Sequence, residues 1–166
     1  MRSGSRARAC GGFTYVALLL GVAVLGVGLA ATGEVWSLAQ QREQEAELLF
    51  VGNQYRRAIG QYFRNTPGGG QRYPERLEDL LEDNRYPMPK RYLRRLYADP
   101  LTGRAEWGFI EAPGGGIMGI YSLSKKKPVK RAQFAARDRI FNEASGYDEW
   151  RFIYEPPITP GLVGGS

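Results

Sequence analysis

The sequence predicts an α+β protein in which one long N-terminal helix packs against a small antiparallel β-sheet head. Two observations indicate the helix. Residues 9–33 are mostly apolar and carry no charge, and residues 34–63 contain no proline and are rich in helix-forming residues. A third observation indicates the sheet: aromatic residues alternate in later segments, as they do in strands with one buried face.

Composition excludes several classes of function. The 166 residues suffice for one small domain with extra segments, and the formal charge of +6 falls to +3 without the three arginines that precede residue 9. No stripe of basic residues interleaved with aromatics is present, which argues against nucleic-acid binding. The chain has no histidine and one cysteine, Cys10, so it lacks Cys/His metal sites, an internal disulfide and histidine-based catalysis. Cys10 precedes the apolar run, whereas a lipidated cysteine follows one, so we interpret it as incidental.

The uncharged run of 25 residues, 9–33, is long enough to cross a bilayer, which takes about 20 apolar residues in a helix. Arginines precede the run and Glu34 is the first charge after it. This asymmetry predicts a cytoplasmic N-terminus and an exported head. Two other interpretations stay open at this point: a secretory signal cleaved near residues 28–30, for which the run is long, and a plain uncleaved anchor.

The helix is expected to continue beyond the membrane. Apolar residues in the second half recur at spacings of three and four and define one helical face: Leu48, Val51, Tyr55, Ile59 and Tyr62. We expect Glu45, Arg56 and Arg57 to lie opposite them, largely in solvent. Gly52 and Gly60 each cost the helix about 1 kcal/mol against alanine.

The two halves together predict one helix over residues 13–63, about 75 Å long. An isolated domain does not need so long a helix, whereas a subunit that packs laterally in a filament does. A coiled-coil-like stalk is the alternative, although the heptads are not sustained.

The first part of the head reads as loop and short helix. Residues 64–74 have loop composition, and Pro74 starts a helix of two to three turns that places Leu77, Leu80 and Leu81 on one face. Its acidic residues are interpreted as the wet side of this helix, in preference to a catalytic or metal site: Glu78, Asp79, Glu82 and Asp83. A turn is predicted at Asp99, Pro100 and Gly103. The arginines before it form either a basic patch or a solvated face: Arg91, Arg94 and Arg95.

Three strands are predicted, at residues 105–111, 116–124 and 149–155. Their alternating aromatics are Trp107 and Phe109 in the first strand, and Trp150, Phe152 and Tyr154 in the third. The glycines at 114–116 favour a hairpin between the first two strands; they are not a phosphate loop, because no Gly-Lys-Ser/Thr follows. A helical turn is expected around residues 134–141, and the Pro/Gly-rich residues 156–166 are expected to be disordered.

The sequence GGFT at residues 11–14, between a basic leader and an apolar run, resembles the processing site of type IV pilins and type II secretion pseudopilins. The resemblance implies that a prepilin peptidase cuts between Gly12 and Phe13 and methylates Phe13, so that the apolar run is retained. Thr14, Ala17 and Glu34 would then belong to the assembly helix.

The layout of the head resembles that of the major pseudopilin, in the order YP at 73–74, RYL at 91–93, DP at 99–100 and an aromatic strand. Two departures stand out. The family usually has a glutamate at the position of Ala17, where it is thought to meet the amino terminus of a neighbouring subunit. Where major pseudopilins carry an aspartate-rich calcium loop, this chain has lysines at 125–127, so we predict no calcium there.

The sequence thus predicts a pseudopilin of a type II secretion system that is not an enzyme and has no catalytic residues, cofactor or metal. Its segments would be a leader, 1–12, the transmembrane and periplasmic halves of the helix, 13–33 and 34–63, a head, 64–155, and a tail, 156–166. It would cross the bacterial inner membrane once, with its head in the periplasm.

Its expected partners are the prepilin peptidase, other pseudopilin subunits and the inner-membrane assembly platform. The alternatives are a membrane-anchored periplasmic binding module with a basic and aromatic head, or a subunit of a type IV pilus. What the lysine-rich loop, residues 125–131, contacts is left open, as is whether Ala17 marks a tip subunit.

Overall fold

The computed structural model describes residues 11–157, except for the side chains of 11–14 and 25–35. Residues 1–10 of the predicted leader, 1–12, and residues 158–166 of the predicted tail, 156–166, lie outside these residues. Helix α1, Gly11–Arg64, extends slightly beyond both ends of the predicted helix. The chain forms two compact units that meet between Gln40 and Gln41 within α1, and each is described by itself.

The first unit, up to Gln40, consists of the first part of α1. Its large apolar side chains that the structure describes are all exposed, among them Leu18 and Val24, at 64% and 70%. Within the described residues, no helix is both long and apolar enough to cross a membrane. The predicted membrane-spanning half, 13–33, includes side chains outside the described residues.

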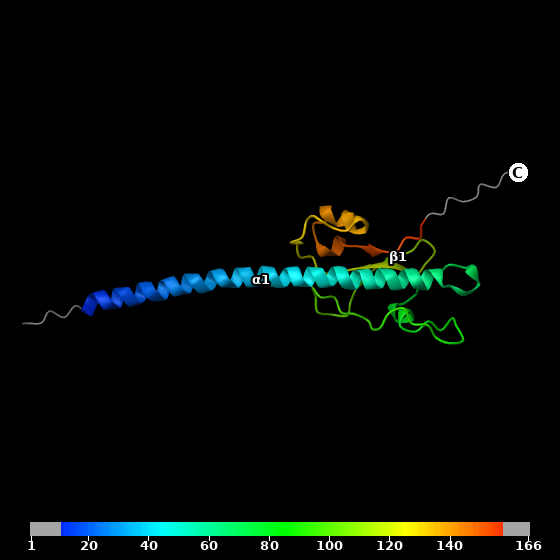
Figure 1. Ribbon diagram of the computed structural model, residues 1–166, viewed down its shortest axis with the longest axis horizontal. Coiled ribbons are helices and arrows are strands. Elements are labelled where there is room, and N and C mark those ends of the chain that lie inside the picture. The colour runs from blue at the N-terminus through cyan, green and yellow to red at the C-terminus, as the bar shows by residue number, and fades with distance from the viewer. Residues whose placement is uncertain (1–10, 158–166) are drawn as a thin grey trace, which may run out of the picture. The chain divides into compact units, whose positions relative to one another are not determined.

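The second unit, from Gln41 onward, combines the last part of α1 with the predicted head, 64–155, and has α+β structure (Figure 1). Its sheet is antiparallel in the order β1-β2-β3 and comprises β1, Gly108–Glu111, β2, Ile117–Tyr121, and β3, Phe152–Ile153. All three predicted strands are therefore present, although each is shorter than predicted. The glycine hairpin is also confirmed: Ala112 N–H donates to the Gly116 carbonyl at 2.9 Å, and Gly115 and Gly116 adopt positive φ.

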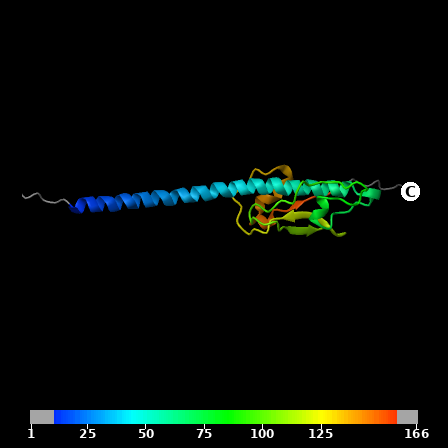
Figure 2. The same cartoon turned by 90° about the horizontal axis from the view of Figure 1, so that it is seen from below.

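Four short 3₁₀-helices complete the described part of the head: η1, Pro67–Gly69; η2, Leu77–Leu80; η3, Ala136–Glu143; and η4, Tyr147–Glu149. The turn that was predicted around 134–141 corresponds to η3. Strands and short helices gather along residues 41–64 of α1, as the two views in Figures 1 and 2 agree. This part of α1 is therefore the element around which the head is built.

One face of α1 and the sheet enclose the core. The predicted apolar face of α1 is buried at every position from Leu48 to Tyr62. The side chains packed against it come mainly from the strands and the connection before β3: Trp107, Ile120, Phe141, Tyr147, Trp150 and Phe152. Phe141 stacks on Trp150 with a centroid separation of 5.3 Å and an interplanar angle of 7°. Periodicity alone therefore identified most of the core residues that α1 supplies.

Gly52 and Gly60, in the second half of α1, have a packing role. A Cβ placed on Gly52 would lie 2.5 Å from the ring of Phe152, and one on Gly60 would lie 2.6 Å from the ring of Tyr154. Strand β3 and the residue after it therefore approach α1 closely because these two positions have no side chain. The helix-propensity cost of the glycines is offset by this contact.

The predicted helix from Pro74 is wrong in extent, because only the single turn η2 forms. A longer helix would need the Leu80 carbonyl to accept from the fourth amide along the chain. That carbonyl instead accepts from the N–H groups of Tyr92 and Leu93, both at 2.9 Å. The Asp79 carboxylate accepts from the Arg76 N–H at 2.9 Å, which closes the turn from its other side.

Two of the predicted solvent-facing residues on α1, and one on the acidic turn, are in fact shielded. Glu45 and Asp83 are buried, at 3% and 1% exposure. Arg56 donates to Asp138 at 2.7 Å, and its side chain is 14% exposed. Arg57 is exposed, as predicted. Each of these charges has hydrogen-bond partners that compensate for its removal from water.

Phe109 is the opposite exception. Its cross-strand partner is Ile120, which in turn pairs with Phe152, so the three share the core-facing side of the sheet. Ile120 and Phe152 are fully buried, yet Phe109 is 51% exposed. It lies on β1, one of the two edge strands; on the other, β3, Phe152 is covered by α1 at Gly52.

Candidate functional site

The residues of the predicted processing site lie at the start of α1. Gly12, Phe13 and Thr14 are within its first turn, and their side chains lie outside the described residues, as does that of Glu34. Ala17 is exposed. The structure thus assigns helical backbone to this segment.

The predicted turn at Asp99, Pro100 and Gly103 is formed. The N–H of Gly103 donates to the Asp99 carbonyl at 2.7 Å, and Gly103 has a φ of +72°. The Asp99 carboxylate accepts from the N–H of Leu101 at 2.9 Å and from the Ser122 hydroxyl at 2.6 Å. Asp99 and Ser122 are both fully buried, so the turn is fastened to the residue that follows β2.

A buried carboxylate, Glu45, holds the lysine-rich loop onto α1. Its Oε1 accepts from the backbone N–H of Val129 at 2.5 Å, from that of Lys130 at 3.0 Å and from the Tyr147 hydroxyl at 2.7 Å. One turn earlier, Gln41 Nε2 donates to the Lys127 carbonyl and to the Tyr147 hydroxyl, both at 3.0 Å. We call Gln41, Glu45 and Tyr147 the loop anchor. It keeps the lysine side chains outward, since 125–127 are exposed.

The pKa values of three tyrosines predict how the head responds to alkali. Burial raises the pKa of Tyr147 to about 12, and its hydrogen bond to Glu45 acts in the same direction. Burial likewise raises the pKa values of Tyr55 and Tyr92 to about 12. In the unfolded chain these hydroxyls would ionise near their ordinary value of 10.0. Their folded state therefore keeps protons that the unfolded state releases.

We expect the stability of the head to be constant from neutral pH up to about pH 10 and to fall between about pH 10 and 12. The measurement is the free energy of unfolding as a function of pH, with Tyr147→Phe as the variant. That variant should flatten the fall, because it removes one of the three groups. A stability that rises above pH 10 would contradict this assignment.

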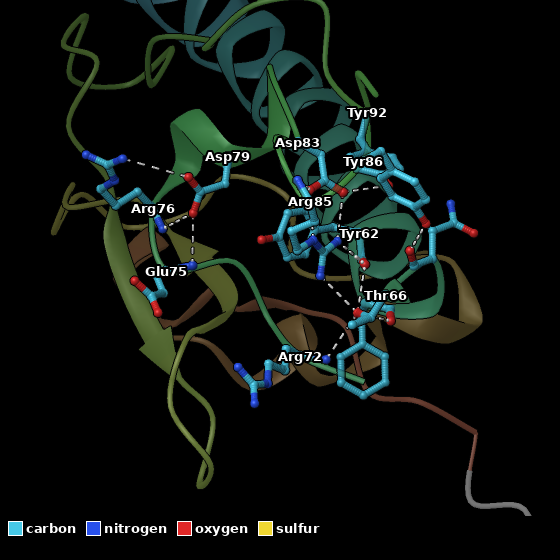
Figure 3. A network of polar contacts seen from close by, with 12 residues as sticks. Tyr62, Thr66, Arg72, Glu75, Arg76, Asp79, Asp83, Arg85, Tyr86 and Tyr92 are labelled. Atoms are coloured by element: carbon cyan, nitrogen blue, oxygen red, sulfur yellow. Dashed lines mark hydrogen bonds and ion pairs between the residues drawn. The ribbon is translucent and has the colours of Figure 1, made fainter. Parts of the chain in front are cut away.

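A second polar network joins the end of α1 to the segment after η2 (Figure 3). Arg85 donates from Nε to Asp83 Oδ1 at 2.7 Å and from Nη2 to Asp83 Oδ2 at 2.8 Å, a bidentate pair. Arg85 Nη2 also donates to the Tyr62 carbonyl at 2.9 Å, and Nη1 to the Thr66 hydroxyl at 3.0 Å. The guanidinium lies 3.5 Å from the centre of the Tyr62 ring.

The electrostatics of Asp83 are those of a carboxylate in a structural ion pair with Arg85. Burial by itself would raise its pKa, but the hydrogen bonds from Arg85 and Tyr92 outweigh burial and hold the pKa below its usual value. The Tyr92 hydroxyl donates to Asp83 Oδ2 at 3.0 Å. Arg85 also terminates α1, because it occupies the carbonyl of Tyr62, one of the last four that a helix leaves free.

Asp83→Asn is expected to lower the free energy of unfolding by about 1.5 kcal/mol, because it removes the charge that accepts from Arg85 and Tyr92 but keeps the side-chain shape. Asn84→Ala, at an exposed neighbouring position, is the matched control and should change little. Chemical denaturation at neutral pH measures both. Equal effects of the two substitutions would show that the ion pair contributes nothing.

Two grooves of opposite charge lie on the head. The basic groove, of about 490 Å³, lies between α1 and the lysine-rich loop, and it is lined by Arg42, Glu45, Ala46, Leu49, Val129, Lys130, Arg131, Ala132 and Gln133. The acidic groove, of about 350 Å³, is lined by Tyr55, Glu75, Arg76, Leu77, Glu78, Leu96, Ala105, Phe109, Glu111 and Ile117. Each groove combines charged side chains with an apolar floor. They are features of a binding surface.

Several charges in these grooves are not neutralised within the head. Among the residues that the structure describes, none of Arg42, Arg131, Glu78 and Glu111 takes part in an ion pair. The described residues also contain no group of three or more Asp, Glu, Cys or His side chains placed to hold a metal ion. What the site offers is therefore charge and apolar area for recognition.

Sequence reasoning missed the anchoring role of Glu45, although a signal for it was present. Glu45 precedes Leu48 by three residues and so extends the buried face of α1 by one turn toward its start. The roles of Asp83 and Asp138 had no such signal. Asp138 contacts Arg56 from 82 residues away, and the periodicity of either segment cannot indicate that pairing.

No protein-family model matches the chain, and no characterised protein or solved structure matches it at a significant level.

Proposed function

We propose that this chain is a pilin-like structural subunit, a pseudopilin of a type II secretion system. It is cut by a prepilin peptidase after Gly12 and assembled through its N-terminal helix. The observation that carries the proposal is that the two parts of α1 differ in the burial of their apolar side chains. Residues 41–64 support a head with its own core, whereas the described apolar side chains between 15 and 24 are exposed.

The exposed apolar side chains at the start of α1 need another environment. Contiguous apolar surface of this kind marks contact with a membrane or with other protein chains. A pilin-like subunit uses both in turn, since its helix sits in the inner membrane before assembly and packs against neighbouring helices afterwards. The GGFT sequence at 11–14 lies between the basic leader and the apolar run, the position that cleavage between leader and helix requires.

The hydrogen bonds within the head support the structural role that we propose. Its buried carboxylates, at Glu45, Asp83, Asp99 and Asp138, all accept hydrogen bonds from other positions of the head. Its working partners would be other pseudopilin subunits and the inner-membrane assembly platform, and its location would be the inner membrane, with the head in the periplasm. Exposed Ala17 leaves no carboxylate for the amino terminus of a neighbour, so packing and the head would take a larger share of assembly.

The test is assembly of the full chain in bacterial cells that contain a prepilin peptidase and a type II secretion platform. We expect sedimentable filaments from the unaltered chain and none from Gly12→Val, which blocks the cut. Gly11→Val, one residue before the last glycine, is the matched control and should still assemble. Filaments from uncut Gly12→Val would refute the proposal. A chain that remains membrane-bound, uncut and unassembled would support a membrane-anchored binding module.

A further inference from the structure

We infer that the basic groove of one subunit binds the acidic groove of a second copy of this chain, in a head-to-tail contact. The inference rests on the proposed function, because it names the partner surface that a filament subunit would use. It is carried by the charges, the apolar groups and the positions of the two grooves, all within the second unit of the structure.

The charges of the two grooves are complementary. Arg42, Lys130 and Arg131 line the basic groove, and the exposed lysines at 125–127 adjoin it along the chain. Its one acidic residue, Glu45, is buried, and its carboxylate already accepts hydrogen bonds from the lysine-rich loop. The acidic groove presents three exposed carboxylates, Glu75, Glu78 and Glu111. Its one basic residue, Arg76, is 4.0 Å from Asp79, which draws it toward a carboxylate of its own subunit.

The apolar groups are also complementary. Phe109 contributes a half-exposed ring to the acidic groove, although its neighbours on the same side of the sheet are fully buried. An aromatic side chain in this state gains from being covered. The basic groove has the apolar side chains of Leu49 and Val129 in its lining. Apolar contact would supply the attraction, and the surrounding charges would set orientation and choice of partner.

The positions of the grooves decide the geometry. The basic groove borders α1 from Arg42 to Leu49, whereas the acidic groove touches α1 at Tyr55. Ten residues of helix, from Glu45 to Tyr55, rise by about 15 Å. Two distinct surfaces, displaced along the helix, can meet twice in a closed two-fold dimer or once at each contact of a head-to-tail chain, and only the second arrangement gives species beyond the dimer. A heterologous contact repeats from copy to copy, and unless it closes into a ring it builds a filament.

The alternative occupant of the basic groove is an anionic membrane surface, to which basic residues are also attracted. The second copy is favoured because the chain itself carries the matching acidic and apolar surface. Membrane binding by the lysines, by contrast, would not account for the acidic groove or for the exposed Phe109.

The test is cysteine crosslinking of the full chain in a Cys10→Ser background, under conditions of filament assembly. Ala132→Cys labels the basic groove and Ala105→Cys labels the acidic groove, both at exposed alanines. With a short thiol-reactive crosslinker, the double variant should give a ladder of dimers, trimers and longer species. Each single variant should stay monomeric. Dimers from one single variant alone would show a symmetric contact and overturn the inference.

Charge reversal tests the pairing itself. Arg131→Glu in the double-cysteine chain should reduce the ladder at least tenfold, because it places like charges together. Adding Glu78→Arg should restore it, whereas Arg151→Glu, the same reversal at an exposed position outside both grooves, should leave it intact. If the ladder is insensitive to reversal, or if Arg131→Glu instead lowers binding to anionic phosphatidylglycerol vesicles, the inference is wrong.

The mass of the mature N-terminus, measured in the same samples, distinguishes failure of the groove pairing from failure of the proposed function. A chain that is cut before Phe13 and assembles into filaments but gives no ladder would overturn the groove pairing and leave the proposed function standing. A chain that is never cut would overturn the proposed function.

Discussion

Glu45→Ala is expected to lower the free energy of unfolding of the head by about 4 kcal/mol. The substitution removes an acceptor that serves two backbone N–H groups and the Tyr147 hydroxyl, and bonds to a charged group contribute about 1.5–3 kcal/mol each. Part of the loss will be recovered by water, because Val129 and Lys130 are only half-buried. Chemical denaturation followed by tryptophan fluorescence measures the change.

Glu47→Ala is the matched control for this prediction. It makes the same chemical change two residues further along α1, at an exposed position, and should alter stability by less than about 0.5 kcal/mol. The lysine-rich loop should also become accessible to protease in Glu45→Ala and stay protected in Glu47→Ala. Equal stability of the two variants would mean that the loop anchor does not hold the loop.

Gly52→Ala is expected to destabilise the head by about 2 kcal/mol, although alanine is the better helix former. Helix propensity favours alanine by about 1 kcal/mol. Against this, the new methyl group would lie 2.5 Å from three ring atoms of Phe152, and overpacking of this kind costs about 1–3 kcal/mol or more. Thermal unfolding of the full chain in detergent measures the net effect.

A second glycine of α1 provides the control. At Gly21, the position that a Cβ would occupy has no neighbouring atom within 4 Å, so Gly21→Ala should leave the unfolding of the head unchanged. The double substitution Gly52→Ala with Phe152→Leu should recover part of the loss, because the smaller side chain makes room. A Gly52→Ala variant that is more stable than the original would contradict the close approach of β3 to α1.

The extent to which the sequence predicts this fold depends on how local the cause of each feature is. The buried face of α1, the glycine hairpin and the turn at Asp99 follow from patterns within ten or so residues, and the structure contains all three. These features arise from periodicity and turn chemistry, which a single sequence displays.

Features that depend on distant partners were not predicted. Glu45 is bonded to residues 84 to 102 positions away, and Arg56 to Asp138 at 82 positions. The helix expected from Pro74 stops early because Tyr92 and Leu93 capture the Leu80 carbonyl. In each case a tertiary hydrogen bond outweighs the local preference, and local preference is all that a pattern reports.

The grooves illustrate the same limit for the candidate site. The lysines at 125–127 and the carboxylates at 75–82 are visible in the sequence, but the enclosing surfaces are not. Phe109 was predicted to face the core, and its register agrees, yet half of its ring is exposed, whereas Phe152 on the other edge strand is covered by α1. Which strand α1 covers is a property of the assembled head.

The central claim, that this chain is a processed filament subunit, is tested most directly by one measurement. It is the mass of the N-terminus of the full chain, extracted from membranes of cells with and without a prepilin peptidase. The account predicts a chain that begins at methylated Phe13 only when the peptidase is present. A chain that begins near Ala31, or one that retains Met1 in both cells, would contradict it.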